Sequence, residues 1–368
     1  MRPAIKAGLL MVWRDPDTLQ FGIDPRRAVA LRGMRGAEPL INLLDGSRDL
    51  GQVLATAHAQ GIGRLAAERV IGLLAAAGAL QDFPAATWRA LPDGPRDRLA
   101  GELATASLAH GYSDGGALVL ARRQAASVRV HGTGPVAASL ASLLAASGVG
   151  RVSCTGVTAP APGGERSSAG PSAAGPSAAD PSAGTPLLPW PPAGRVRLGP
   201  PDAGGSPRGQ RNAAGGRRNA AAAQRLPHLA VLADGYPPEL PGMLVAANVP
   251  HLTMAASEAI GMVGPLVVPG RTACLSCVNM ARTDRDPAWP LILAQAYGRA
   301  PRPAACAAVL AAAVAAQATA QALVFLDRAA PAPAVINGTL ELVLPDWQWR
   351  RHSWVPHPQC RCSSRSAS

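Results

Sequence analysis

The sequence predicts an α/β protein in which a small winged-helix-like α+β domain precedes a Rossmann-type domain whose C-terminus is held by a zinc site. Three observations predict this fold. The hydrophobic period changes from strand-like to helical within the first ninety residues. A G-x-G-x-x-A turn at 132–137 stands between a strand and a helix. Two close cysteine pairs occur at 274–277 and 360–362.

The composition is that of a folded cytoplasmic protein. A chain of 368 residues with 48% hydrophobic residues can form two domains with cores. The net charge is +12, but residues 158–226 carry eight arginines against three acidic residues, so we do not expect a nucleic-acid partner. The apolar run 7–13 is followed by charge, which predicts no signal peptide. Residues 303–326 are uncharged but rich in alanine, so we expect a buried helix and no membrane contact.

Residues 1–90 predict the winged-helix-like domain. Residues 9–23 alternate around an Asp-Pro-Asp turn, and 27–32 form another short strand. Arg64 and Arg69 are the only bases of the second and third helical segments, too few for a DNA-binding winged helix. We therefore expect a peptide to add as a strand to the edge of the wing. The three helical segments are 38–44, 50–60 and 64–80.

Residues 91–127 are expected to form a helical connector, and residues 128–362 the Rossmann-type domain. Residues 158–226 interrupt this domain with the repeat GPSAA, GPSAA, DPSAG and with Pro-, Gly- and Arg-rich sequence. Such a segment cannot bury enough apolar surface to offset the entropy of ordering it. We expect a disordered insertion with one short strand at 195–198, and a disordered tail at 363–368.

The glycine turn begins the Rossmann-type domain at the end of a strand, Val128–Val130. Gly132 allows the tight turn, Gly134 lets a pyrophosphate approach the backbone, and Ala137 permits close packing of the following helix. A nicotinamide site also needs an acidic residue at the end of the second strand to bind the ribose, but that place reads Cys-Thr-Gly at 154–156. A nicotinamide-dependent oxidoreductase is therefore disfavoured.

Four of the six cysteines form the two close pairs and supply the four thiolates that a tetrahedral structural zinc needs. Each close pair lowers the entropy cost of assembling the site. Because the two pairs are far apart in the sequence, a metal bound by both would attach the C-terminus to the domain. His357 is an alternative ligand in place of one sulfur. Cys154 and Cys306 lie in apolar contexts and are expected in the core. The predicted ligands are Cys274, Cys277, Cys360 and Cys362.

Together these motifs resemble the ThiF/MoeB/HesA family, the ubiquitin-activating-enzyme-like proteins. The glycine turn, the strand that ends at Asp234, the segment 263–277 and the terminal His-Pro-Gln-Cys-Arg-Cys carry the resemblance. The tract 283–289 is similar to the ThiF-like proteins of azoline-forming cyclodehydratase pathways in bacteria. The N-terminal domain is similar to the precursor-peptide recognition elements that precede such domains, where a leader peptide adds as a strand to the wing.

The resemblance implies a nucleotide site at the glycine turn, with an acid for the ribose, Arg and Lys for the phosphates, and a later Asp for magnesium and adenylation. Gly132, Gly134 and Ala137 are present, and Asp234 matches the later Asp. The ribose acid is missing, and the only lysine, Lys6, lies in the other domain. Asp234 could equally be a helix cap or turn residue. We expect the binding of ATP and magnesium to be vestigial or weak.

Two functions follow from the resemblance. The first is a non-catalytic scaffold that captures a precursor peptide through its leader and docks a YcaO-type cyclodehydratase, which would itself hydrolyse ATP. The second is an ATP-dependent adenylyltransferase that activates the C-terminus of a ubiquitin-like or sulfur-carrier protein. The missing lysine and ribose acid favour the scaffold. The resemblance also implies a homodimer.

Overall fold

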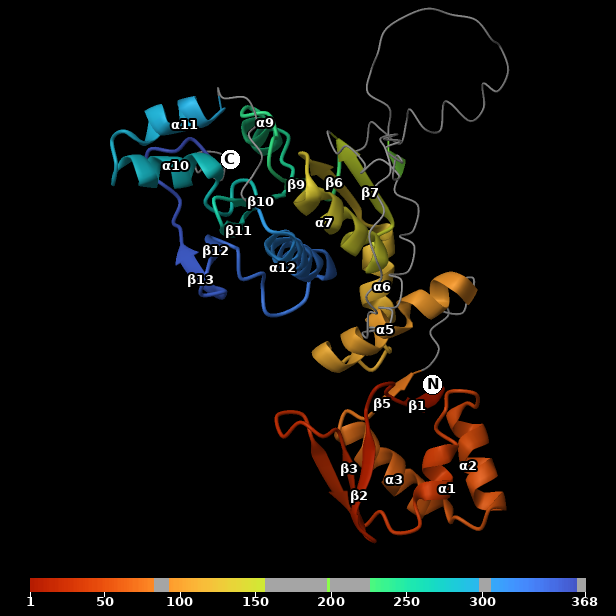
Figure 1. The fold of residues 1–368 in the computed structure, drawn as a ribbon. Coiled ribbons are helices and arrows are strands. Elements are labelled where there is room, and N and C mark those ends of the chain that lie inside the picture. The colour runs from red at the N-terminus through yellow and green to blue at the C-terminus, as the bar shows by residue number, and fades with distance from the viewer. Residues whose placement is uncertain (83–92, 156–196, 199–225, 298–305, 363–368) are drawn as a thin grey trace, which may run out of the picture.

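The computed structural model shows an N-terminal domain, a helical connector and a larger α/β domain (Figure 1). It describes residues 1–82, 93–155, 197–198, 226–297 and 306–362. Most of the predicted disordered insertion, 158–226, and all of the predicted tail, 363–368, lie outside the described residues.

The N-terminal domain packs three helices against an antiparallel sheet of order β2-β3-β4. The central strand contributes Leu19 and Phe21 to the core, and Asp49 forms a capping box with Gln52 at the start of α2. The elements are β2 (Met11–Asp15), β3 (Thr18–Phe21), β4 (Val29–Arg32), α1 (Glu38–Asn42), α2 (Leu50–Ala59) and α3 (Arg64–Ala76).

The third helix is shorter than the sequence predicted. It ends at Ala76 because Gly78 turns the chain with a positive φ of 68°. The chain then enters a strand, β5 (Leu80–Asp82), which pairs antiparallel with β1 (Pro3–Ile5). This second small sheet closes the domain by joining its two ends.

The connector consists of α5 (Asp93–His110) and α6 (Ala117–Ala125). Lys6 of the N-terminal domain is buried, and its Nζ donates to the Ser107 carbonyl of α5 at 3.2 Å. The Ser107 hydroxyl donates to Gln81 Oε1 at 2.9 Å. Burial lowers the pKa of Lys6, against the attraction of Asp114. The only lysine of the chain therefore holds the first domain to the connector.

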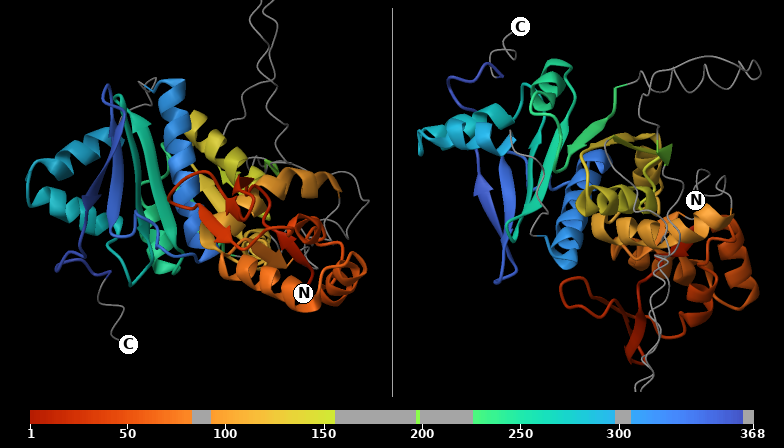
Figure 2. Two further views of the ribbon diagram at one scale, coloured as in Figure 1. Left: turned by 90° about the horizontal axis from the view of Figure 1, so that it is seen from below. Right: turned by 45° about the horizontal axis from the view of Figure 1, so that its top comes forward.

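The α/β domain contains a mixed sheet of order β13-β12-β11-β10-β9-β6-β7-β8 (Figure 2). Strands β10, β9, β6, β7 and β8 run parallel, and β11, β12 and β13 continue the sheet antiparallel. The predicted strand at 195–198 is observed over two residues at the parallel edge. The strands are β6 (Ser127–His131), β7 (Arg151–Thr155), β8 (Arg197–Leu198), β9 (Leu229–Leu232), β10 (His251–Ser257), β11 (Ile260–Val267), β12 (Gly338–Val343) and β13 (Gln348–Ser353).

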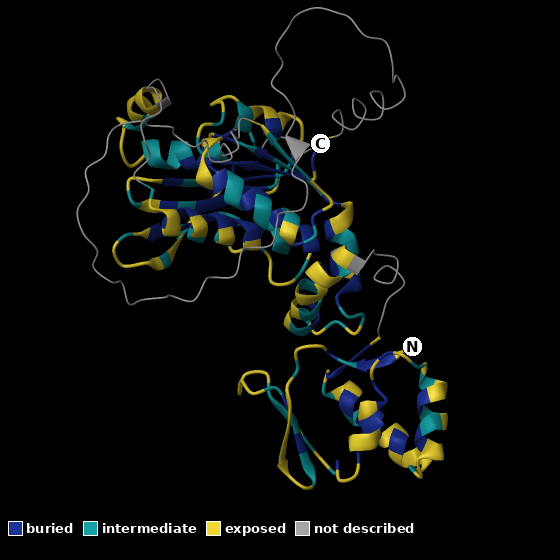
Figure 3. Cartoon of the chain, turned by 45° about the vertical axis from the view of Figure 1, so that its right-hand side comes forward, coloured by how far each residue is buried: buried dark blue, intermediate teal, exposed yellow. Residues whose placement is uncertain are grey.

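The predicted membrane-length helix is α12 (Ala308–Asp327), which packs against the sheet beside α7. It is long and apolar enough to cross a membrane, but half of its apolar stretch is buried (Figure 3). Leu310, Val314 and Ala318 are fully covered by strands and by α7. The apolar composition is therefore explained by a core position. The other helices are α7 (Pro135–Ala146), α9 (Leu240–Ala246), α10 (Leu275–Thr283) and α11 (Trp289–Tyr297).

A buried ion pair joins the end of α12 to the connector. The Arg123 guanidinium of α6 donates to both carboxylate oxygens of Asp327, at 2.8 and 2.7 Å, and to Glu102 of α5 at 2.8 Å. It also donates to the Ser147 carbonyl at the end of α7. The side chains of Arg123 and Asp327 are only 9% and 3% exposed. Four helices thus meet at one buried guanidinium.

Replacing Asp327 with alanine should lower the free energy of unfolding by about 3–5 kcal/mol, because it leaves a buried guanidinium with one partly exposed partner. Urea unfolding of the full chain would measure this. The control is Glu68→Ala, which removes the exposed Arg64–Glu68 pair of α3 and should cost at most about 1 kcal/mol. Equal small effects of the two changes would contradict the role given to Arg123.

Candidate functional site

The structure brings the four predicted cysteines together. Cys274 Sγ lies 3.7 Å from Cys277 Sγ and 3.6 Å from Cys360 Sγ, and Cys277 Sγ lies 3.3 Å from Cys362 Sγ. All four sulfurs lie within 4.8 Å of one another. Zinc–sulfur bonds of about 2.3 Å in a tetrahedron require sulfur separations of about 3.8 Å. The buried cluster is therefore compatible with structural zinc.

Local hydrogen bonds place the first cysteine pair. After β11 the chain turns, and the Thr272 hydroxyl accepts from the Val268 amide at 2.8 Å. The Ala273 amide donates to Asn337 Oδ1, also at 2.8 Å. Cys274 is then the N-cap of α10, which puts Cys277 one turn further along the same side of the helix. The C-x-x-C spacing thus brings the two thiols together because the pair lies in the first turn of a helix.

The predicted alternative ligand, His357, lies outside the four-sulfur cluster. Its Nε2 donates to Asp284 Oδ2 at 2.9 Å, and its Nδ1 accepts from the Gln359 amide at 3.2 Å. The Cys360 amide donates to the His357 carbonyl, which forms the turn that presents the C-x-C pair. His357 therefore shapes the second cysteine loop, and its ring nitrogens are engaged elsewhere.

The buried environment of the cluster changes how readily its thiols ionise. Burial raises the pKa of Cys360 and of Cys362, so these thiols resist ionisation without a metal. Burial also opposes ionisation of Cys277, but hydrogen bonds from the backbone of His357 and Cys274 bring its pKa below the usual thiol value. A divalent cation would supply the charge that four thiolates need in a buried site.

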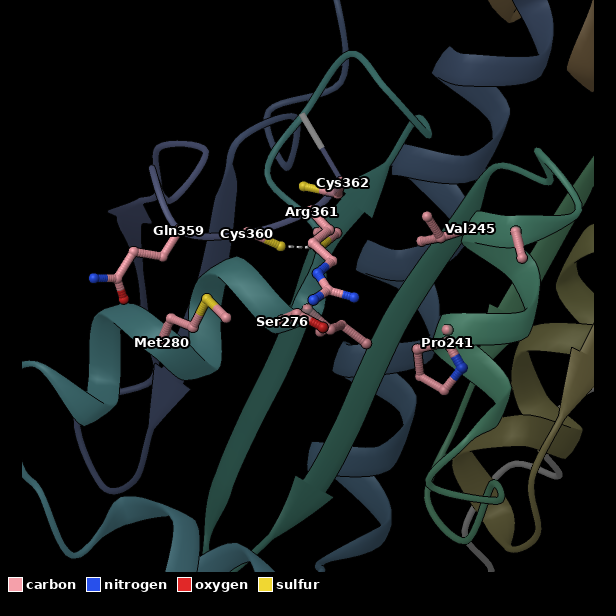
Figure 4. A pocket seen from close by; sticks show the side chains of 12 residues that line it. Pro241, Val245, Ser276, Met280, Gln359, Cys360, Arg361 and Cys362 are labelled. Carbon is pink, nitrogen blue, oxygen red and sulfur yellow. Dashed lines mark hydrogen bonds between the residues drawn. The ribbon is translucent and has the colours of Figure 1, made fainter. Parts of the chain in front are cut away.

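A cavity of about 600 Å³ lies beside the cluster, between α9 and α10 (Figure 4). Pro241 and Val245 line it from α9, Met280 lines it from α10, and Arg361 extends into it from between the last two cysteines. Both cysteine loops contribute to its wall. Metal binding would therefore fix the shape of this cavity as well as the C-terminus.

The glycine turn has the predicted position between β6 and α7. Gly132 and Gly134 have φ values of 127° and 91°, which favour glycine. A Cβ at Gly132 would lie 2.7 Å from the carbonyl oxygens of Ala233 and Asp234, whereas a Cβ at Gly134 would meet no atom of the described residues within 4 Å. Ala137 is fully buried under the sheet core. Only the second glycine therefore faces space that a ligand could fill.

Asp234 lies two residues after the end of β9, beside this turn. Its carboxylate accepts from the Ala256 amide of β10 at 3.2 Å, and its carbonyl accepts from the Thr133 amide at 2.9 Å. Burial raises the pKa of Asp234. The N-cap of α9 is Glu239, so Asp234 does not cap that helix and instead ties neighbouring strand ends together.

Thr155, at the end of the second strand where a ribose acid was expected, is paired with His131, a residue that the sequence did not single out. His131 and Thr155 end neighbouring parallel strands in register, and His131 Nδ1 lies 2.8 Å from Thr155 Oγ1. Burial, with a smaller effect of Arg129, lowers the pKa of His131 to about 4, so the pair is neutral near pH 7. His131 and Thr155 lie at the same distance in sequence from the starts of β6 and β7, and this equal spacing could have predicted the pair.

Cys154 and Cys306, which were expected in the core, are partly buried and pack against the edge of the main core cluster. Burial raises the pKa of both thiols. The charge of Asp234 also raises the pKa of Cys306, which places this thiol near the glycine turn. That proximity could not be predicted from the sequence, because it depends on where α12 begins in the folded chain.

No protein-family model and no curated protein matches this sequence. Solved structures do match it, and they show that the chain has the α/β fold of MccB, which is of the ThiF type. Escherichia coli MccB, solved with AMPCPP and MccA, has a TM-score of 0.59 and 13% identity over 99% of both chains. The heterocyclase TruD has a TM-score of 0.60 and 14% identity over 98% of this chain and 42% of its own. The predicted resemblance is thus confirmed for the fold over the full chain.

Replacing Cys274 and Cys277 with serine should release zinc and lower the melting temperature sharply, because metal binding contributes directly to folding. Metal analysis of the purified protein and calorimetry would measure both. The matched control is Cys306→Ser, a cysteine outside the cluster, which should retain the full zinc content. Unchanged zinc in the double variant would remove the assignment of these ligands.

Proposed function

We propose that this protein binds the leader of a ribosomally made precursor peptide and docks a YcaO-type cyclodehydratase, and that it is not itself the catalyst. The observation that carries the proposal is a three-stranded sheet in the N-terminal domain whose two outer strands each pair on one side only. Such edges accept an extended peptide through backbone hydrogen bonds.

The pairing register shows which backbone groups are available. The Gly22 amide donates to the Leu10 carbonyl, so Leu10 and Gly22 form a hydrogen-bonded pair. In an antiparallel sheet, hydrogen-bonded and non-bonded pairs alternate, so the next pair, Met11 with Phe21, is non-bonded. The Met11 amide therefore points away from β3. The same alternation directs the Ala30 amide of β4 away from β3. All five residues of β2 are exposed, including Trp13. An added strand would also cover this apolar surface.

The second support is that the described residues around the glycine turn include no lysine and no ribose-binding acid. Nucleotidyl chemistry depends on cations that stabilise phosphate charge. The only lysine is buried against Ser107, and the end of β7 holds Thr155, paired with His131, in place of an acid. The turn is therefore explained by its structural role, the connection between β6 and α7.

The solved relatives agree with a role in peptide maturation. MccB has been solved with MccA, and a heterocyclase has been solved with substrate and cofactor; the latter has a TM-score of 0.57 and 14% identity over 98% of this chain. MccB has also been solved with ATP, and Asp234 with the open face of Gly134 favours a second candidate, an ATP-dependent adenylyltransferase acting on a carrier protein.

Proline at position 11 or 30 removes an outward amide from one edge of the sheet, on β2 or β4. We expect the affinity for the leader peptide to fall at least tenfold for one of these variants and to stay unchanged for the other, because an added strand bonds to a single edge. Fluorescence anisotropy with a labelled leader peptide would measure this. Wild-type affinity in both variants would argue against strand addition.

Titration calorimetry with ATP and magnesium separates the two candidates. We expect at most weak binding at millimolar ATP, since the described residues around the glycine turn include no lysine and no acid at the end of β7. Tight binding accompanied by pyrophosphate exchange would instead establish the adenylyltransferase. Asp234→Asn is the control for any weak signal, because it removes the carboxylate but keeps its size.

A further inference from the structure

The outer strand β2 and the residues next to it present an apolar edge to solvent. Residues 7–13 contain no charged side chain. Exposed apolar residues are common singly, but a run of them along one hairpin is typical of an interaction site. The exposed ones here are Leu10 (52%), Met11 (43%), Val12 (41%), Trp13 (40%) and Ile23 (69%).

This edge lacks the features that usually keep an outer strand from pairing with another chain. Such features are charged side chains, prolines and bulges. The other outer strand, β4, has the first of them, because Arg32 lies exposed within it and Arg27 lies exposed two residues before it. Along β2 the charges begin only at Arg14, and the one register shift in its pairing comes after Trp13. The edge therefore needs a permanent cover, which a peptide that binds and leaves does not provide.

The backbone of β2 is arranged symmetrically about its centre. Met11 lies opposite Phe21 in a non-bonded pair, and two residues further on Trp13 lies opposite Leu19 in another. The N–H and C=O groups of Met11 and Trp13 therefore point away from β3. A second β2, running antiparallel, can form a hydrogen-bonded pair between Met11 of one copy and Trp13 of the other, and can form it twice. A two-fold axis then passes between the two Val12 residues.

The side chains of β2 match the same symmetry. Met11 and Trp13 lie on the same face of the sheet as their partners in β3, which are buried in the core. About the two-fold axis, each Met11 would lie beside Trp13 of the other copy, and a thioether next to an aromatic ring is a favourable contact. On the opposite face, Val12 would meet Val12 of the other copy. The exposed apolar side chains of β2 are thus self-complementary.

We propose that β2 is a dimer interface at which two copies of this chain pair antiparallel about Val12, which joins their three-stranded sheets into one of six strands. The proposal rests on the symmetry and exposure of the strand and does not require the proposed function. Together with that function, it leaves β4 as the open edge for an added peptide.

The test uses the full-length protein and two variants at the axis, V12E and V12K. Either variant alone places two like charges opposite each other, whereas an equimolar mixture allows a glutamate to face a lysine. The matched control is A30E, which adds the same charge at an exposed position of the other outer strand. Sedimentation velocity measures the Kd of self-association, native mass spectrometry detects the mixed dimer, and anisotropy measures the affinity for the leader peptide.

We expect the Kd of self-association to rise at least about tenfold in V12E and in V12K, and to stay within twofold of wild type in A30E. The mixture of V12E and V12K should recover a mixed dimer, which would also show that both variants are folded.

An oligomer that both variants retain unchanged would place the interface elsewhere and overturn the proposal. A monomeric wild-type protein whose leader affinity falls in V12E would also overturn it, since β2 would then bind the leader and the proposed function would stand. Dimers that behave as expected in a protein that binds no leader would support the interface and contradict the proposed function.

Discussion

The parallel half of the sheet depends on how closely Gly132 approaches the end of β9. A side chain there would collide with the carbonyl oxygens of Ala233 and Asp234, and the next amide, from Thr133, bonds to Asp234. The first glycine of the motif is therefore required by the fold itself, whether or not a nucleotide binds. Only Gly134, with open space above it, retains a position that a phosphate could use. The presence of a Rossmann-type turn is thus not by itself evidence that a nucleotide binds.

The features that could be predicted from the sequence depend on local geometry or on specific chemistry. The glycine turn is local, because a strand, two glycines and a helix follow one another directly. The cysteine cluster spans 86 residues between Cys274 and Cys360, yet it was predictable because two close thiol pairs have few other roles in such a chain. The pairing of His131 with Thr155 could also have been found, since parallel strands in register bring equal positions together.

Other features depend on contacts between distant segments that no local pattern encodes. The pairing of β1 with β5 replaced the end of the predicted third helix, and the partners Arg123 and Asp327 are 204 residues apart. The exposure of α11 was likewise hidden, because an apolar sequence does not say whether the folded chain covers it. Both α12 and α11 are apolar in sequence, yet α12 is largely buried and α11 is largely exposed.

The N-terminal domain and the α/β domain are connected through buried polar contacts on both sides of the connector. The open sheet edges lie at one end of the chain, and α11 lies with the cysteine cluster at the other (Figure 1). Lys6 and Arg123 hold the joints between them through buried polar contacts. Such contacts contribute little net stability but strongly disfavour other orientations, because any misplacement leaves a charge buried and unpaired. Under the proposed function, this fixed geometry would serve to present a bound peptide to a separate enzyme.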